Sequence, residues 1–291
     1  MSASPTRAGA ITEIRRRTPG RVAEALRERP RFPGFAGIDK LLVIAADHPA
    51  RGSLAVGRDP RAMADRGDLL ARIQVALSRP GVHGFLGTAD LVEELALLGA
   101  LDHKLVLGSM NRGGIAGTGF ELDDRFTGYD ARGIAAAGLD GGKMLLRIDP
   151  DDPASVVTME ACARAVDELA ELGLIALVEP FWSTRVAGKV RNDLSPDAVI
   201  RSIAIASGLG RTSAYTWLKL PAVPEMDRVL ASTTMPTLLL GGEVGPGDPS
   251  EQPWRSAVAS PAVTGLAVGR SLLYPPDGDV AAAVDEAVEL L

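Results

Sequence analysis

The stretch Leu41-Leu-Val-Ile-Ala-Ala-Asp-His-Pro-Ala-Arg-Gly52 decides between two fold classes. Residues 41–46 are small or branched and apolar without a break, which is typical of a parallel strand buried on both faces. A doubly wound open sheet normally has a glycine-rich turn, G-x-G-x-x-G, after such a strand. The turn over 47–52 lacks this pattern. We therefore expect the other class, a (β/α)8 barrel.

Similar apolar runs recur along the chain, and most are followed by a helical pattern. The predicted strands cover 41–46, 82–86, 104–107, 141–148, 174–178, 214–220, 237–240 and 264–268. The predicted helices cover 58–78, 89–99, 155–172, 195–208, 225–231 and 279–290. Eight such units in about 250 residues indicate one (β/α)8 TIM barrel of the α/β class. We assign residues 36–291 to the barrel and 1–35 to an N-terminal helical extension.

Composition narrows the functional classes. The net charge is −6 and lysines form no block, so we expect no nucleic-acid partner. The single cysteine, Cys162, permits no disulfide framework within the chain, which favours a cytoplasmic location. No apolar run approaches the ~20 residues of a membrane span. The three histidines have no metal-ligand spacing, so we expect neither a metal nor a cofactor.

One lysine stands on a predicted strand, in Ala214-Tyr-Thr-Trp-Leu-Lys-Leu-Pro221. A buried, unpaired ammonium is costly, and a lysine that gives up its proton easily is a nucleophile toward carbonyls. The alternative is a surface lysine at a strand end, with its stem against apolar neighbours. If the strand alternates, Lys219 shares an inward face with Trp217.

Three further charged residues stand on predicted inward faces: Asp47, Lys143 and Glu179. In a barrel, chemistry takes place where the strands end, so we expect these groups and Lys219 to share one pocket. Charges of balanced sign can be buried together, and a second ammonium favours the neutral form of a neighbouring amine. The alternatives are a loop cap for Asp47, a strand-end ion pair for Glu179 and a surface position for Lys143.

The last two predicted strands end in glycine, at Gly241-Gly242 and Gly269-Arg270. Glycine lets backbone N–H groups approach an anion, and the loops after the last two strands of such barrels often bind phosphate. We therefore predict a phosphate site there, with a charge-assisted contact from Arg270. The insertion 109–130 is long and glycine-rich, and we expect it to overhang the same end of the barrel.

These segments resemble the class I aldolases of the deoxyribose-phosphate, archaeal-type fructose-bisphosphate and tagatose-bisphosphate aldolase superfamily, over roughly 38–275. The segments that carry the resemblance are Ala46-Asp47 with Arg51-Gly52-Ser53-Leu54, Lys143-Met-Leu-Leu-Arg-Ile-Asp-Pro150, Val178-Glu179-Pro180, Leu218-Lys219-Leu220-Pro221, Gly241-Gly242 and Gly269-Arg270. The tagatose-bisphosphate enzymes have Asp-Gln-Arg-Gly-Ser at the first segment. Here His48 replaces the glutamine, and Pro49 and Ala50 are additional.

The resemblance implies that Lys219 forms a Schiff base and that Lys143, Glu179 and Asp47 assist it. It also implies that His48 and Arg51 contact the substrate, that Gly241, Gly242, Gly269 and Arg270 bind its phosphate, and that the chain assembles into a homo-oligomer. Residues 45–52 and 125–130 are similar to an actinobacterial subgroup associated with inositol breakdown. That similarity implies cleavage of 2-deoxy-5-keto-gluconate 6-phosphate to dihydroxyacetone phosphate and malonate semialdehyde.

Two other functions stay open on the same barrel. A thiolase of related sequence would use a similar lysine for acyl transfer and would depend on coenzyme A. A non-catalytic phosphosugar-binding barrel would bind its ligand without cleaving it. A buried pair of lysines at the strand ends favours the aldolase over the binding protein, because binding alone has less need of a nucleophile.

Overall fold

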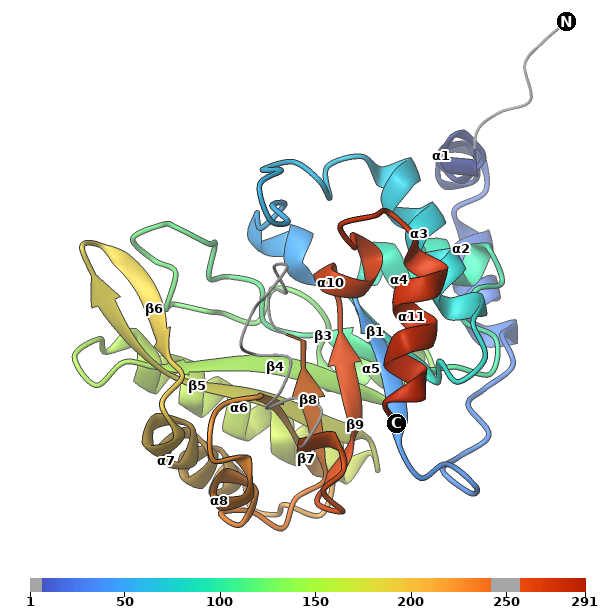
Figure 1. Ribbon diagram of the computed structural model, residues 1–291. Helices are drawn as coiled ribbons and strands as arrows, with labels where there is room; N and C mark the ends of the chain where they lie inside the picture. Colours follow the sequence, from blue (N-terminus) through green and yellow to red (C-terminus); the bar gives the residue numbers. More distant parts are fainter. Residues whose placement is uncertain (1–6, 242–256) are drawn as a thin grey trace, which may run out of the picture.

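Eight parallel strands close into a barrel in the computed structural model, which describes residues 7–241 and 257–291 (Figure 1). Neighbouring strands follow the order β4-β3-β2-β1-β9-β8-β7-β5, and pairing of β4 with β5 closes the ring. This confirms the predicted (β/α)8 barrel. The strands are β1 (Leu41–Ala45), β2 (Gly84–Gly87), β3 (Leu105–Ser109), β4 (Gly141–Ile148), β5 (Ile175–Val186), β7 (Thr216–Pro221), β8 (Thr237–Leu240) and β9 (Val263–Val268).

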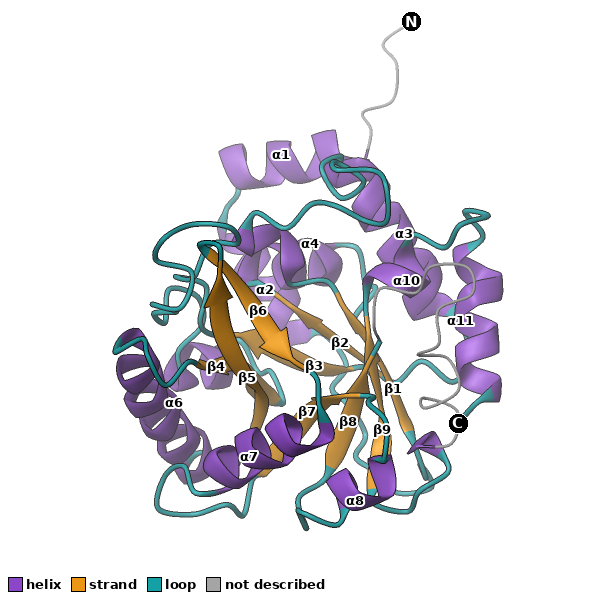
Figure 2. Ribbon diagram, turned by 60° about the vertical axis from the view of Figure 1, so that its left-hand side comes forward, coloured by secondary structure: helices purple, strands orange, loops and turns teal. Residues whose placement is uncertain are grey.

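Helices surround the barrel (Figure 2). They are α3 (Arg66–Ser78), α4 (Ala89–Leu97), α5 (Ala131–Ala136), α6 (Ala154–Glu171), α7 (Pro196–Ser207), α8 (Met226–Leu230), α10 (Arg270–Leu273) and α11 (Val280–Glu289). The helix predicted over 58–78 begins only at Arg66, because the Asp65 side chain caps it by accepting a hydrogen bond from the backbone N–H of Asp68. None of the helices that the structure describes is both long and apolar enough to cross a membrane.

The period-two alternation of the strands builds two separate apolar cores. On β1, Leu42 and Ile44 face outward and pack with the helices. Leu41, Val43 and Ala45 face inward and fill the barrel. The same alternation sets the direction of the polar residues that follow each strand, since successive side chains point to opposite faces. Residues two positions beyond an inward apolar side chain therefore enter the barrel at its C-terminal end.

The N-terminal segment first packs on the outer helices, where Arg15 pairs with Glu93 and Glu94 of α4, and then crosses the end of the barrel where the strands begin. It begins with α1 (Arg7–Arg17) and α2 (Gly20–Glu28), and Pro19 directly precedes α2. Beyond them, Phe32 and Ile38 join Trp217 on the inner apolar cluster, and the Phe35 ring lies 5.5 Å from that of Trp217. These aromatic contacts cover the end of the barrel where the strands begin. The division into a 1–35 extension and a 36–291 barrel stays a prediction.

One strand continues far beyond its predicted end. We expected a strand over 174–178, but β5 runs to Val186 and pairs antiparallel with β6 (Lys189–Asp193). The apolar run ends at Val178, yet Phe181 and Trp182 still pair with Arg147 and Ile148 of β4. The β-forming residues after Pro180 thus extend the strand into a hairpin that projects from the barrel (Figure 2).

Candidate active site

Lys219 lies inside the barrel at the end where the strands finish. It is the fourth residue of β7, and only 4% of it is exposed. Trp217, two residues earlier, packs on the inner apolar cluster, so the alternation of β7 directs Lys219 inward as well. Its Nζ lies 2.9 Å from Oε1 of Glu179. The expected inward orientation is therefore present, and the amine is paired with a carboxylate.

Glu179 bridges two buried lysines. Lys219 reaches one of its carboxylate oxygens, and Nζ of Lys143 forms an ion pair with the other, Oε2. Lys143 is 3% exposed, and its Nζ also lies 3.3 Å from Oδ2 of Asp47. The structure thus brings the four predicted catalytic residues into one continuous chain of alternating charge. Such pairing offsets the cost of removing each charged group from water.

The surroundings lower the pKa values of two of these groups for different reasons. Burial lowers the pKa of Lys143 well below that of an ordinary lysine, and the nearby cations, Lys219 first among them, lower it further against the opposing effect of Glu179. Burial alone would raise the pKa of Glu179, but the ammonium groups of Lys143 and Lys219 outweigh it and hold that pKa below its usual range. Glu179 therefore stays ionised, while Lys143 is an amine that gives up its proton readily.

Arg112 belongs to this cluster and was not among the predicted site residues. It is 7% exposed, its Nη2 forms an ion pair with Asp47, and its Nε donates a 2.8 Å hydrogen bond to Ser109 Oγ. Ser109 Oγ in turn donates to Oδ2 of Asp47 at 3.1 Å. The available signal in the sequence was a charged residue three positions after the end of β3, since active-site residues of barrels follow the strands.

The insertion 109–130 is held over the site by buried ion pairs. Arg51 pairs with Asp124 at 2.6 Å and donates to the carbonyl of Asn111 at 2.7 Å. Arg147, which shares the inward face of β4 with Lys143, pairs with Glu121 at 2.6 Å. The expectation that this loop overhangs the C-terminal end agrees with these contacts. The guanidinium of Arg51 is bound by the loop, and its contact with substrate stays a prediction.

His48 lies at the rim of the site as a neutral imidazole. Burial first, and then the cations Arg270 and Lys219, lower its pKa to about 3. Its Nδ1 has no hydrogen-bond partner in the part of the chain that the structure describes. Its ring faces the predicted phosphate turn, because a Cβ added to Gly269 would lie 3.1 Å from His48 Cε1. These positions agree with a residue that contacts substrate, which stays a prediction.

The two glycine turns lie where the backbone is closely packed. A Cβ on Gly269 would lie 2.3 Å from the carbonyl oxygen of Ala45, and one on Gly241 would lie 2.6 Å from a methyl group of Val268. Both turns therefore require glycine irrespective of any ligand. Arg270 follows directly as the first residue of α10. Gly242 lies outside the described residues, so the structure does not place that part of the predicted phosphate site.

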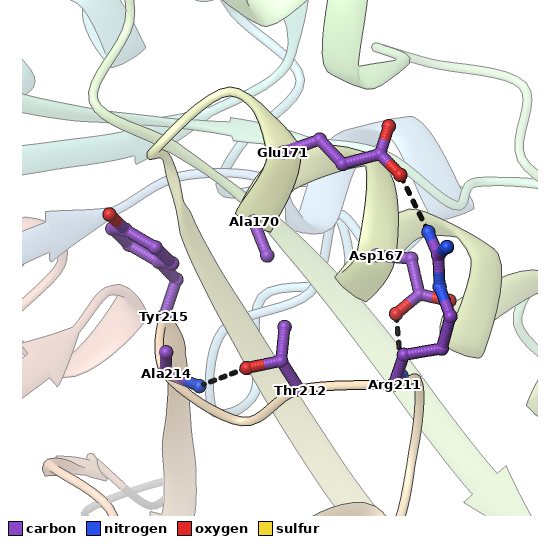
Figure 3. Close-up of a pocket in the computed structure, with 7 residues that line it drawn as sticks. All are labelled: Asp167, Ala170, Glu171, Arg211, Thr212, Ala214 and Tyr215. Carbon is purple, nitrogen blue, oxygen red and sulfur yellow. Dashed lines mark hydrogen bonds and ion pairs between the residues drawn. The ribbon is translucent and has the colours of Figure 1, made fainter.

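A surface pocket lies away from these residues (Figure 3). It is formed by the end of α6 and by the segment that leads into β7, where Arg211 pairs with Asp167 and Glu171. This segment enters β7 at its beginning, whereas Lys219 lies near its end. The pocket therefore belongs to the other end of the barrel and contains none of the clustered lysines.

Comparison with known proteins identifies one family and a set of structural neighbours. The model of the Cgl0159-like family matches residues 39–288. The crystal structure of Cgl0159 from Corynebacterium glutamicum has 54% sequence identity and a TM-score of 0.95, over 99% of this chain and 97% of that one. A search of curated proteins finds no match.

More distant solved structures share the fold. An archaeal fructose-1,6-bisphosphate aldolase, whose catalytic lysine is covalently bound to the carbinolamine intermediate of the substrate, has a TM-score of 0.61 and 18% identity, over 92% of this chain and 98% of that one. A fructose-bisphosphate aldolase from Slackia heliotrinireducens has a TM-score of 0.63 and 14% identity, over 93% and 89%. At these identities the likeness shows the barrel fold alone.

Proposed function

Because the chain belongs to the Cgl0159-like family and joins Lys219, Glu179 and Lys143 in one buried cluster, we propose that it is a class I aldolase. The cluster is the observation that carries the proposal. It places a paired amine at the active end of a barrel, next to a second amine with a lowered pKa. Two of the solved structures that share the fold are aldolases, which supports the same reaction class.

In the proposed reaction, Lys219 Nζ adds to the ketone carbon of the substrate and forms a carbinolamine. Loss of water gives an iminium ion, which accepts the electron pair when the neighbouring C–C bond breaks. The hydroxyl on the departing carbon loses its proton, and that fragment leaves as an aldehyde. The remaining enamine takes a proton on carbon, and water then releases the second product and restores the amine.

The neighbours of Lys219 supply the proton transfers. Lys143 gives up its proton readily, and it is linked to Lys219 through Glu179, so it can relay a proton released by the nucleophile. The proton from the cleaved hydroxyl passes to Glu179 or Asp47, the two carboxylates of the cluster. General acid and base groups of this kind typically contribute about 10²- to 10⁴-fold to a rate.

The proposed substrate is a phosphorylated keto sugar or keto acid. The turns at Gly241 and Gly269 with Arg270 would hold its phosphate. Within this class, similarity of residues 45–52 and 125–130 to the inositol-breakdown subgroup favours 2-deoxy-5-keto-gluconate 6-phosphate, which cleaves to dihydroxyacetone phosphate and malonate semialdehyde. The two segments contact the same part of the loop. Arg51 and the backbone carbonyl of Arg125 both form hydrogen bonds with residues 111–114.

Borohydride trapping tests the proposal. Incubation with dihydroxyacetone phosphate and borohydride should inactivate the enzyme, and Lys219→Ala should abolish the covalent adduct. An adduct that persists in Lys219→Ala would refute the assignment. Turnover that requires coenzyme A would instead indicate acyl transfer, and phosphosugar binding without retro-aldol products would indicate a binding protein.

A further inference from the structure

Arg112 is a buried cation with one nitrogen left for a ligand. Its Nε donates to Ser109, and its Nη2 contacts Ser109 and Asp47. Nη1 donates no hydrogen bond to any residue within 7–241 or 257–291. It is also not one of the fully buried polar atoms that lack a hydrogen-bond partner in that part of the chain. It therefore borders open space, although the residue as a whole is only 7% exposed. A guanidinium with an open face in a buried site favours a bound anion.

The position of Arg112 in the ring decides which end of a substrate it would meet. Arg112 follows β3, while Gly241 follows β8, and these strands are four places apart around the eight-stranded ring in either direction. Lys219 on β7 and Lys143 on β4 stand between them on one side. A substrate with its phosphate at the glycine turns and its ketone at Lys219 would thus extend its other end toward Arg112.

The loop that carries Arg112 holds it in place. The backbone N–H groups of Arg112 and Gly113 both donate to the carbonyl of Arg125, at 3.1 and 3.0 Å. A Cβ on Gly113 would lie 2.6 Å from the Arg125 nitrogen, so the close approach requires glycine. Since its backbone and two of its guanidinium nitrogens are fixed, Arg112 is preorganised, and less entropy is lost when it binds a ligand.

We propose that Arg112 is a specificity-determining residue that binds a carboxylate at the end of the substrate remote from the phosphate. This rests on the proposed aldolase function and narrows the substrate class to phosphorylated keto acids. One nitrogen without a partner among the described residues suits a singly charged carboxylate. A second phosphate has three acceptor oxygens and up to two charges, and it would lie beside the carboxylate of Asp47.

The test is aldol synthesis from dihydroxyacetone phosphate with three acceptor aldehydes. These are malonate semialdehyde, the uncharged propanal and glyceraldehyde 3-phosphate. We expect the wild type to favour malonate semialdehyde over propanal by about 10- to 100-fold in kcat/KM, the usual strength of a charge-assisted hydrogen bond. Arg112→Gln should bring this ratio close to one. Arg112→Lys should also lower this ratio. Because it keeps a positive charge beside Asp47, it serves as the test if the glutamine variant folds poorly.

The matched control is Arg125→Gln, an exposed arginine in the same loop, which should keep the wild-type ratio. Because Arg112 also contacts Asp47, the Arg112 variants should react more slowly with every acceptor. If Arg112 acted only through Asp47, the ratio between acceptors would stay unchanged. An unchanged ratio in both Arg112 variants, or a preference for the phosphorylated acceptor, would overturn the subsite. Absence of a borohydride adduct in the wild type would instead overturn the aldolase function itself.

Discussion

The carboxylate of Glu179 on β5 accepts a 2.9 Å hydrogen bond from the amine of Lys219 on the neighbouring strand β7, inside the barrel. Its other oxygen pairs with Lys143, so a single anion compensates two buried cations. Removing one partner from a buried pair leaves an uncompensated charge, which is far more costly than the pair itself. The properties of the whole cluster therefore depend on Glu179.

Glu179→Gln should reduce kcat by about 100- to 10,000-fold, the range for loss of a general acid or base. The amide keeps the shape of the side chain but removes its charge and its capacity to take a proton. Steady-state retro-aldol kinetics measure the loss. Glu160→Gln is the control, because Glu160 is an exposed partner of Arg164 on α6, and it should leave kcat unchanged. Near-normal turnover in Glu179→Gln would exclude Glu179 from the chemistry.

Lys143 should make stability rise with pH in the alkaline range. Its pKa is lowered in the folded protein, while an unfolded lysine has a pKa of about 10.4. Between these values the unfolded chain binds more protons, so the free energy of unfolding increases with pH. Urea unfolding at pH 7 and pH 9.5 should show this increase in the wild type and a smaller one in Lys143→Met. The exposed Lys189→Met should behave as the wild type, and equal slopes in all three would contradict the lowered pKa.

Arg51→Ala should loosen the loop 109–130, because it breaks the buried ion pair with Asp124 and two hydrogen bonds to loop carbonyls. Breaking such a pair costs about 3–5 kcal/mol of stability. Chemical denaturation gives the global loss, and hydrogen exchange of the peptide over 112–125 shows whether the loop opens. Arg125→Ala removes an exposed pair in the same loop and should change neither. Equal protection in Arg51→Ala and the wild type would show that the loop is held by other contacts.

Gly269→Ala should weaken phosphate binding, because its Cβ would lie 2.3 Å from the Ala45 carbonyl and push the turn away from the site. We expect KM for the phosphorylated substrate to rise by at least about tenfold, the equivalent of one lost hydrogen bond to a charged group. Gly119→Ala, where an added Cβ meets nothing within 4 Å, is the control. An unchanged KM in Gly269→Ala would place the phosphate elsewhere.

Much of this architecture follows from local patterns in the sequence. Continuous apolar runs such as 41–46 predicted the barrel strands, and period-two alternation predicted that Lys143, Glu179 and Lys219 face inward. Both depend on neighbouring residues in the chain, so they need no tertiary information. The structure confirms the barrel, and the catalytic roles stay predictions.

Other features depend on contacts between distant segments. The hairpin β5–β6 was missed because the continuous apolar run ends at Val178, although pairing with β4 continues past it. Arg112 was missed because its role depends on Asp47, which lies 65 positions earlier in the chain. The substrate contact of Arg51 stays a prediction, while its partner Asp124 was missed because the pair forms only when the long loop folds back. Patterns along one segment do not reveal such pairings.

The most direct test of the central claim is peptide mapping of the enzyme after reduction with borohydride in the presence of dihydroxyacetone phosphate. Modified lysine resists trypsin, so the adduct should appear on an uncleaved peptide over 212–228 that contains Lys219. The same experiment on Lys219→Ala should give no adduct. An adduct located on Lys143, or no adduct on any peptide of the wild type, would contradict the assignment of Lys219 as the nucleophile.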